Sequence, residues 1–378
     1  MRRIVICGGG FCGQHAVSRL QRTLRDRSRV ELLLVDWAQS FLFTPMLLPM
    51  LAGLERVDRA ALPWARVVDT HRVQLLKDEL LAVETAQQRV FLERMGWLNY
   101  DALILALGSA RAPGALPGVR TFEEGLELKA RLIRRPEALS VIGGGPVGCE
   151  LAGVLCELSP GPRTTLYEAG PQLLAGMGDT ARPMAFDAQT ELTSKGVSLR
   201  LGVRVDERPD GVWAGDDALE PAVTIDCRAG KPPLLEGLPT TAAGRIPVNR
   251  QLRLEGGGEV YVGGDCAQVD GEPELRRGIA RAVSHGQTIA ENVHAGLTGR
   301  ARIGLKDASP SFVLRLGNER AVGLARGVSV SGSAAWTLRQ SVMVSQSPAL
   351  NQKLTLATEA GLQAAKQSVS WFLGKLKR

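Results

Sequence analysis

Short apolar runs that end in glycine dominate the pattern at the start of the chain. Residues 4–7, Ile-Val-Ile-Cys, are uniformly apolar and stop at three glycines, which is typical of a parallel strand buried on both faces. Residues 13–25 have helical character, and residues 30–36 form a second apolar run that ends in Asp36. Strand, glycine turn, helix and strand in this order predict a βαβ unit.

The same pattern occurs a second time, with a strand at 138–142, a helix at 146–158 and a strand at 164–168. This internal duplication predicts an α/β protein with two Rossmann-like domains, and therefore sites for two dinucleotides. Residues 169–244 read as loop-rich, and the segment after 300 gives only weak signals. Other apolar runs predict further strands at 100–109 and 260–265 and a helix at 280–297.

The first glycine turn has the spacing of a phosphate-binding loop. Gly8, Gly10 and Gly13 form a complete G-x-G-x-x-G between a predicted strand and a predicted helix. The first glycine permits the tight turn, the second lets the backbone approach a pyrophosphate, and the third allows close helix–strand packing. Asp36 stands at the end of the next strand, where a carboxylate accepts hydrogen bonds from ribose hydroxyls.

The second turn repeats these features and adds information on the cofactor. Gly143, Gly145 and Gly148 form the loop, and Glu168 ends the following strand. A carboxylate binds a free ribose 2′-hydroxyl and repels a 2′-phosphate, and residues 167–170 contain no arginine. The sequence therefore favours NADH over NADPH at this loop.

Composition narrows the class of protein further. The 378 residues contain no run of 18 apolar residues and no recognisable signal peptide, so we expect a cytoplasmic protein. The six cysteines form no C-x-x-C pair and no zinc-binding spacing, so neither a metal site nor a disulfide-reductase pair is expected.

Positive charge gathers in the C-terminal segment. The whole chain carries +7, whereas residues 301–378 alone hold eleven Lys or Arg and three Asp or Glu, a net charge of +8. This asymmetry suggests an anionic partner surface, either nucleic acid or lipid headgroups. No nucleic-acid recognition motif accompanies the charge, so nucleic acid is not the expected partner.

These motifs together resemble those of two-dinucleotide-binding flavoproteins, the pyridine nucleotide-disulfide oxidoreductase superfamily. Within it, residues 43–49 and Ala52-Gly53 are similar to the F-T-P-L-L-P…A-G stretch of type II NADH dehydrogenases. Residues 143–153, Gly-Gly-Gly-Pro-Val-Gly-Cys-Glu-Leu-Ala-Gly, are similar to their G-G-G-P-T-G-V-E-L-A-G. The resemblance covers about residues 1–295 and implies an enzyme that binds FAD at the first loop and NADH at the second.

The resemblance also implies roles for residues outside the loops. Asp265 binds the ribityl or pyrophosphate part of FAD, and Gly108 ends a strand that passes under it. Thr44 and Pro45 lie near the isoalloxazine ring. Glu150 lies in the nicotinamide pocket, although the first turn of a helix also favours a carboxylate for structural reasons alone.

The electron acceptor is less clear from the sequence. Type II dehydrogenases usually have glutamines in an A-Q-x-A-x-Q-Q-G motif, whereas this chain has Ala280 and Ser284-His285 at those positions. His285 could hydrogen-bond or pass a proton to a reduced acceptor, or have a structural role. Quinone is the leading acceptor. A small redox protein such as ferredoxin is the alternative, and an FAD- and NADH-binding scaffold with little turnover is a third.

The expected layout follows from these assignments. Residues 1–135 and 236–300 form the FAD-binding domain, residues 136–235 the NADH-binding domain, and residues 301–378 a basic cap. Apolar residues at helical spacing predict that the end of the cap lies on the inner face of the cell membrane, with packing on the core or in a homodimer as alternatives. These residues are Leu362, Ala365, Val369, Phe372, Leu373 and Leu376.

Overall fold

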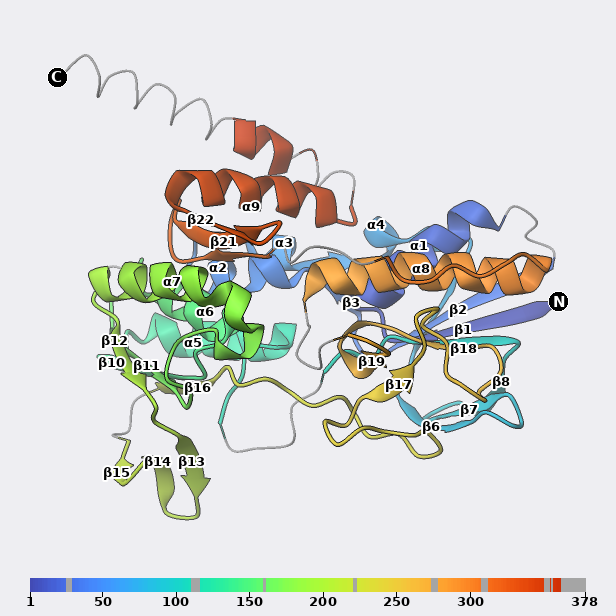
Figure 1. Ribbon diagram of the computed structural model, residues 1–378, viewed down its shortest axis with the longest axis horizontal. Coiled ribbons are helices and arrows are strands. Elements are labelled where there is room, and N and C mark those ends of the chain that lie inside the picture. The colour runs from blue at the N-terminus through green and yellow to red at the C-terminus, as the bar shows by residue number, and fades with distance from the viewer. Residues whose placement is uncertain are drawn as a thin grey trace. The chain divides into compact units, whose positions relative to one another are not determined.

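The computed structural model describes residues 1–24, 29–109, 116–158, 161–219, 223–272, 278–306, 312–349, 354 and 356–361. The predicted apolar stripe at the end of the cap lies outside these residues. The chain divides into two compact units, shown in Figure 1. Unit 1 contains Met1–Phe41, Leu62–Pro113 and Gly230–Asp307, and unit 2 contains Leu42–Ala61, Gly114–Ala229 and Ala308–Arg378.

Unit 1 is built on a five-stranded parallel sheet in the order β18-β9-β1-β2-β5. Its central strand has no exposed residue from Ile4 to Cys7, which explains the uniformly apolar run. Helices α1 (Phe11–Thr23) and α8 (Ile279–Thr298) pack against each other. The strands of the sheet are β1 (Arg2–Cys7), β2 (Val30–Asp36), β5 (Gln74–Lys77), β9 (Ala102–Leu105) and β18 (Val260–Val262).

Smaller elements complete unit 1. An antiparallel sheet contains β6 (Leu80–Glu84), β7 (Arg89–Leu92) and β8 (Gly96–Asn99). Strands β17 (Ile246–Val248) and β19 (Ala267–Val269) form a parallel pair. The turn η4 (Gly264–Cys266) connects β18 to β19 and carries Asp265 at the carboxyl edge of the main sheet.

Unit 2 repeats the parallel arrangement with four strands in the order β12-β11-β10-β16. Helices α5 (Phe122–Ile133), α6 (Pro146–Leu155) and α7 (Arg182–Ser194) contribute buried residues to its core. An antiparallel sheet adds β13 (Val205–Arg208), β14 (Gly211–Ala214) and β15 (Asp217–Ala218). The parallel strands are β10 (Ala138–Ile142), β11 (Arg163–Glu168), β12 (Ser198–Leu201) and β16 (Val223–Asp226).

The segment beyond residue 300 is more regular than the sequence suggested. An antiparallel sheet and helix α9 (Gly332–Gln346) pack together, and Leu314 and Leu324 enter the core of unit 2. None of the helices that the structure describes is long and apolar enough to cross a membrane. The three strands are β20 (Phe312–Arg315), β21 (Ala321–Ala325) and β22 (Val328–Ser331).

The α/β prediction is therefore confirmed, with both predicted βαβ units in place. The loop-rich expectation for residues 169–244 was wrong in part, because α7 and several strands lie there. Helix α7 buries Met184, Ala188 and Leu192 at i, i+4 spacing. One alanine separates the two larger side chains, and Phe186 is 68% exposed, so the apolar stripe is weak in the sequence.

Candidate functional site

The first glycine loop forms an open helix N-terminus at the carboxyl edge of the sheet in unit 1. Gly8 has φ +99°, a value that favours glycine. A Cβ on Gly13 would lie 1.9 Å from the carbonyl oxygen of Gly8, so helix and strand pack too closely for any side chain. Gly10 is the N-cap of α1, and no atom lies within 4 Å of its Cβ position. The free N–H groups of this helix start can therefore approach a phosphate.

Asp36, at the end of β2, is bonded directly to this loop. Its Oδ2 accepts the N–H of Gly9 at 2.5 Å, and its Oδ1 accepts the N–H of Ala38 at 2.7 Å. Burial raises the pKa of Asp36, while the two N–H donors oppose that shift. Trp64 covers Gly9 and donates from Nε1 to the carbonyl of Ala38 at 3.3 Å.

The second loop, in unit 2, repeats this geometry closely. Gly143 also has φ +99°, and a Cβ on Gly148 would lie 1.9 Å from the Gly143 carbonyl oxygen. Glu168 accepts the N–H of Gly144 at 2.6 Å and that of Gly170 at 2.7 Å. Gly145 is the N-cap of α6, with open space at its Cβ position. Each loop thus places one carboxylate beside one open helix N-terminus.

Two further predicted residues lie at the edge of the sheet in unit 1. Asp265 is half-buried, and within the described residues its carboxylate has no hydrogen-bond partner. Gly108 follows β9 with φ +67°, and its Cβ position is open. A half-buried acceptor without a protein partner, beside an open glycine loop, fits the ribityl or diphosphate part of FAD.

His285 is fully buried in helix α8. Its Nδ1 accepts the N–H of Gly264 at 3.2 Å, so the proton of the neutral ring is on Nε2. That Nε2 is buried and finds no partner among the described residues. Burial, aided by the charge of Arg281, lowers the pKa of His285 to about 3, so the ring is neutral at physiological pH.

Glu150 lies in α6, inside unit 2. Its Oε1 accepts the backbone N–H of Arg315 at 2.8 Å. Burial raises the pKa of Glu150, and the charges of Arg339 and Arg315 oppose that shift. Arg339 also donates to the carbonyl of Pro45 at 3.3 Å, which brings the Phe-Thr-Pro stretch and α9 together. The guanidinium carbons of Arg315 and Arg339 lie 5.1 and 5.7 Å from the ring centre of Trp336.

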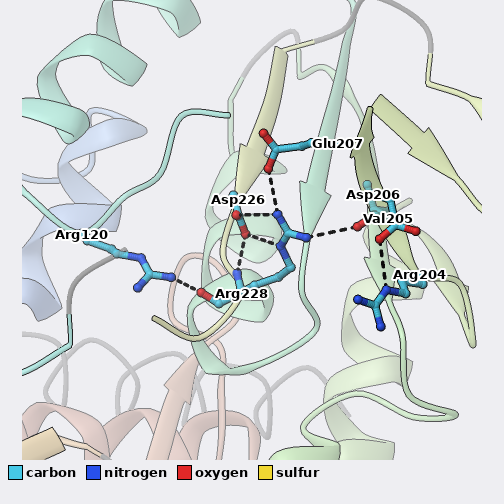
Figure 2. Close-up of polar contacts among 7 residues, drawn as sticks. All are labelled: Arg120, Arg204, Val205, Asp206, Glu207, Asp226 and Arg228. Carbon is cyan, nitrogen blue, oxygen red and sulfur yellow. Dashed lines mark hydrogen bonds and ion pairs between the residues drawn. The ribbon is translucent and has the colours of Figure 1, made fainter. Parts of the chain in front are cut away.

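A second polar cluster, shown in Figure 2, lies at the end of β16 and was not predicted. Arg228 binds Asp226 with two nitrogens, at 3.0 and 2.9 Å, and Glu207 at 3.1 Å. It also donates to the Val205 carbonyl at 3.1 Å. The backbone nitrogen of Arg228 would lie 3.0 Å from a Cβ on Gly143, so the cluster fixes the chain beside the glycine loop.

Arg120 and Arg204, also drawn in Figure 2, differ in their surroundings. Arg120 donates to the carbonyl of Arg228, whereas Arg204, 82% exposed, pairs with Asp206 at the surface. Nothing in the sequence distinguishes these arginines, because their spacing to their partners follows no recurring motif. The same holds for Arg315 and Arg339, which the sequence does not distinguish from Arg320 and Arg326 between them.

The cysteines complete the chemical description of the site. All six are free, and five of them are buried. Burial raises the pKa of Cys7 and Cys12, which flank the first loop, so both stay protonated at physiological pH. Neither thiol is therefore available as a thiolate nucleophile. The fold and its two loops define an α/β oxidoreductase with two dinucleotide sites.

Comparison with known proteins gives the family. Residues 2–288 match the pyridine nucleotide-disulphide oxidoreductase family, and the chain belongs to it. Demethylphylloquinone reductase NdbB of Synechocystis is 28% identical over 387 residues, 94% of each protein. Type II NADH:quinone oxidoreductase Ndh of Mycobacterium tuberculosis is 28% identical, covering 79% of this chain and 73% of that enzyme.

Solved structures show the same fold. NDH2 of Plasmodium falciparum in complex with NADH is similar with a TM-score of 0.79 and 13% identity, covering 95% of this chain and 97% of that one. The sulfide:quinone oxidoreductase of Aquifex aeolicus has a TM-score of 0.75 and 16% identity, covering 91% and 90%. The predicted family and the prediction of an FAD-dependent oxidoreductase that uses NADH are thus confirmed.

Proposed function

We propose that this enzyme takes a hydride from NADH onto FAD and passes the electrons to a quinone. The observation that carries the proposal is the pair of complete loops, each with an open helix N-terminus and a carboxylate bonded to the residue after its first glycine, Gly9 or Gly144. Two such loops suit two dinucleotides, one resident and one exchanged. Relatives whose names specify demethylphylloquinone or quinone reduction support a quinone as acceptor.

We assign the FAD site to unit 1, and Thr44 and Pro45 stay residues that the sequence resemblance predicts near the flavin. Asp36 suits the adenosine ribose and Asp265 the ribityl or diphosphate part. Bound flavin would supply the exchange between two-electron and one-electron chemistry, and the protein supplies binding, orientation and exclusion of water. The proposed FAD residues are Gly8, Gly10, Gly13, Asp36, Thr44, Pro45, Gly108 and Asp265.

We assign the NADH site to the second loop in unit 2. Its residues are Gly143, Gly145, Gly148 and Glu168, and the acid favours the free 2′-hydroxyl of NADH. Glu150 is proposed for the nicotinamide side, since it lies on α6, the helix that follows the loop, just beyond its first turn, and keeps one oxygen without a bond to the described residues. For His285, the neutral ring and its bond to Gly264 support a role in shaping the FAD site. Proton delivery to the acceptor stays a separate prediction for this residue.

Anaerobic stopped-flow spectroscopy tests the proposed function. The FAD-loaded enzyme is mixed with NADH or NADPH and then with a short-chain quinone, while the flavin absorbance is followed. We expect rapid bleaching by NADH and rapid recovery with quinone. Bleaching without recovery by quinone would instead point to a protein acceptor such as ferredoxin. Failure of either nucleotide to bleach the flavin would contradict the proposal.

We also propose that the basic C-terminal segment contacts an anionic membrane surface. The net charge of +8 after residue 300 supports this, because polybasic segments bind anionic headgroups. Sedimentation with vesicles of anionic or neutral lipid tests it. Binding to anionic vesicles that weakens with salt, and is lost when residues 362–378 are removed, is the expected result. Equal binding to both vesicle types would overturn the proposal.

A further inference from the structure

Helix α8 contacts the first glycine loop and the turn that follows β18, two parts of the proposed FAD site in unit 1. A Cβ on Gly286 would lie 2.2 Å from the carbonyl oxygen of Cys12, so α8 packs directly on the first turn of α1. A Cβ on Gly263 would lie 2.6 Å from the sulfur of Cys12 and 3.1 Å from the Cβ of His285. The glycine loop and the turn that follows β18 are therefore held against the same helix.

Arg281, one helical turn before His285, is bonded to the turn that carries Asp265. Its Nη1 donates to the carbonyl of Gly264 at 2.7 Å, and its Nη2 donates to the carbonyl of Ala267 at 3.3 Å. The guanidinium is 10% exposed and is paired with Glu272 at 2.8 Å. A planar guanidinium with several donors can bridge two carbonyls and a carboxylate at once, which a lysine cannot do.

The bonds to this turn leave one group free. The N–H of Gly264 is bonded to His285, and the carbonyls of Gly264 and Ala267 are bonded to Arg281. The carboxylate of Asp265, between them, has no partner among the described residues. The backbone is thus held at Gly264, directly before the acid, and at Ala267, two residues after it, while the side chain of Asp265 stays available to a ligand.

We propose that Arg281, neutralised by Glu272, is a positioning residue that holds Asp265 in the orientation that binds FAD. The inference rests on the FAD site of the proposed function. A buried ion pair alone would be weak grounds for a role, because desolvation cancels most of its attraction. Two further observations support the role: Arg281 bonds the carbonyls of Gly264 and Ala267, which enclose Asp265 and Cys266, and α8 is the helix that packs against the glycine loop.

Titration of the apoprotein with FAD, followed by flavin fluorescence, tests whether Arg281 positions Asp265. We expect Arg281→Met to raise the Kd for FAD about tenfold or more, since charge-assisted bonds to the turn are lost. Arg281→Lys should give an intermediate increase, and Glu272→Gln a smaller one. Because the titration measures affinity and not turnover, its result holds whichever electron acceptor the enzyme uses.

Arg302→Met is the matched control. Arg302 lies in the same unit and pairs with Glu259 and the hydroxyl of Tyr261, away from the FAD turn. It should lower thermal stability without changing the Kd for FAD. If Arg281→Met lowers thermal stability to the same degree as Arg302→Met and leaves the Kd for FAD unchanged, the positioning role of Arg281 is refuted.

A double-mutant cycle with Asp265→Asn separates positioning from general stability. If Arg281 acts through Asp265, the two substitutions together should raise the Kd little more than Asp265→Asn alone, because their effects are coupled. Additive effects would show that Arg281 influences FAD binding independently of Asp265, which would also overturn the proposal. If Arg281→Met fails to fold, the same cycle is measured with Glu272→Gln and Asp265→Asn, because Glu272→Gln keeps the arginine.

Discussion

The two glycine loops of this enzyme have nearly the same backbone but different surroundings. Both first glycines have φ +99°, and both third glycines would place a Cβ 1.9 Å from the first carbonyl oxygen. In both, the acid at the end of the second strand accepts the N–H of the residue after the first glycine, Gly9 or Gly144. The sequence spacing alone therefore determines the local geometry, wherever in the chain the motif occurs.

The difference between the loops lies in the side chain that covers Gly9 in the first and Gly144 in the second. A Cβ on Gly9 would lie 2.3 Å from the ring of Trp64, which packs edge-on against Phe41, with ring centres 6.2 Å apart. The same position on Gly144 meets the aliphatic side chain of Leu173 at 2.6 Å. An aromatic cluster thus supports the first loop, whereas an aliphatic side chain supports the second.

The largest expected effect comes from the third glycine of each loop. Gly13→Ala should abolish FAD retention, and Gly148→Ala should leave FAD bound but reduce NADH-dependent bleaching more than about 100-fold, because a methyl group collides with the first carbonyl. Flavin content and stopped-flow rates measure both. Gly10→Ala is the control for folding, since its Cβ position is open, and the apoprotein should keep its stability. Retention of FAD by Gly13→Ala would contradict the close packing.

The next effect concerns the support of the second loop. Arg228→Ala removes the two side-chain bonds of Arg228 to Asp226, which is 6% exposed, and should lower the free energy of unfolding by about 2 kcal/mol. Arg204→Ala, at the exposed pair in Figure 2, should change it by less than about 0.5 kcal/mol. Urea denaturation of both variants measures the difference. Equal effects would show that the Arg228 cluster contributes no more than a surface ion pair.

Substitution of the two acids sharpens the assignment of the loops. Glu168→Gln should raise the KM for NADH about tenfold and narrow the preference over NADPH, because the negative charge that opposes a 2′-phosphate is lost. Asp36→Asn is the reciprocal variant and should weaken FAD binding while leaving the KM for NADH unchanged in FAD-saturated enzyme. Steady-state kinetics with both nucleotides test this. A loss of NADH affinity in Asp36→Asn instead would reverse the assignment.

The smallest expected effect is a pH dependence that belongs to unit 1. The pKa of His285 is about 3 in the folded protein and near 6.5 when unfolded, so only the unfolded chain takes up this proton as the pH falls from 6.5 towards 3. Because of His285, the free energy of unfolding should therefore fall by about 0.7 kcal/mol when the pH is lowered from 7 to 6. His285→Gln should lack this contribution in denaturation measured at both values. An identical pH slope in the variant would indicate that His285 is not buried as a neutral ring.

The sequence was most informative where one local rule decides the structure. The glycine spacing, the apolar strands and the acids at their ends all follow from contacts within about 30 residues, and each lies where it was predicted. The prediction was poorest for α7 and for the sheet and helix after residue 300. Their apolar positions are few and small, so burial in the core of unit 2 stabilises them more than their own pattern does.

The sequence by itself thus determined the fold class and the two glycine loops, and it predicts NADH at the second loop. Only the tertiary structure decided which charges support those sites. Arg281 reaches Gly264 and Ala267, Arg228 reaches Val205 and Glu207, and Arg315 and Arg339 approach Glu150. Arg315 bonds Glu150 across 165 residues of chain, and even over the shorter separations a charged side chain has no periodicity that predicts its partner. The backbone motifs are local, whereas the electrostatic environment depends on how the whole chain packs.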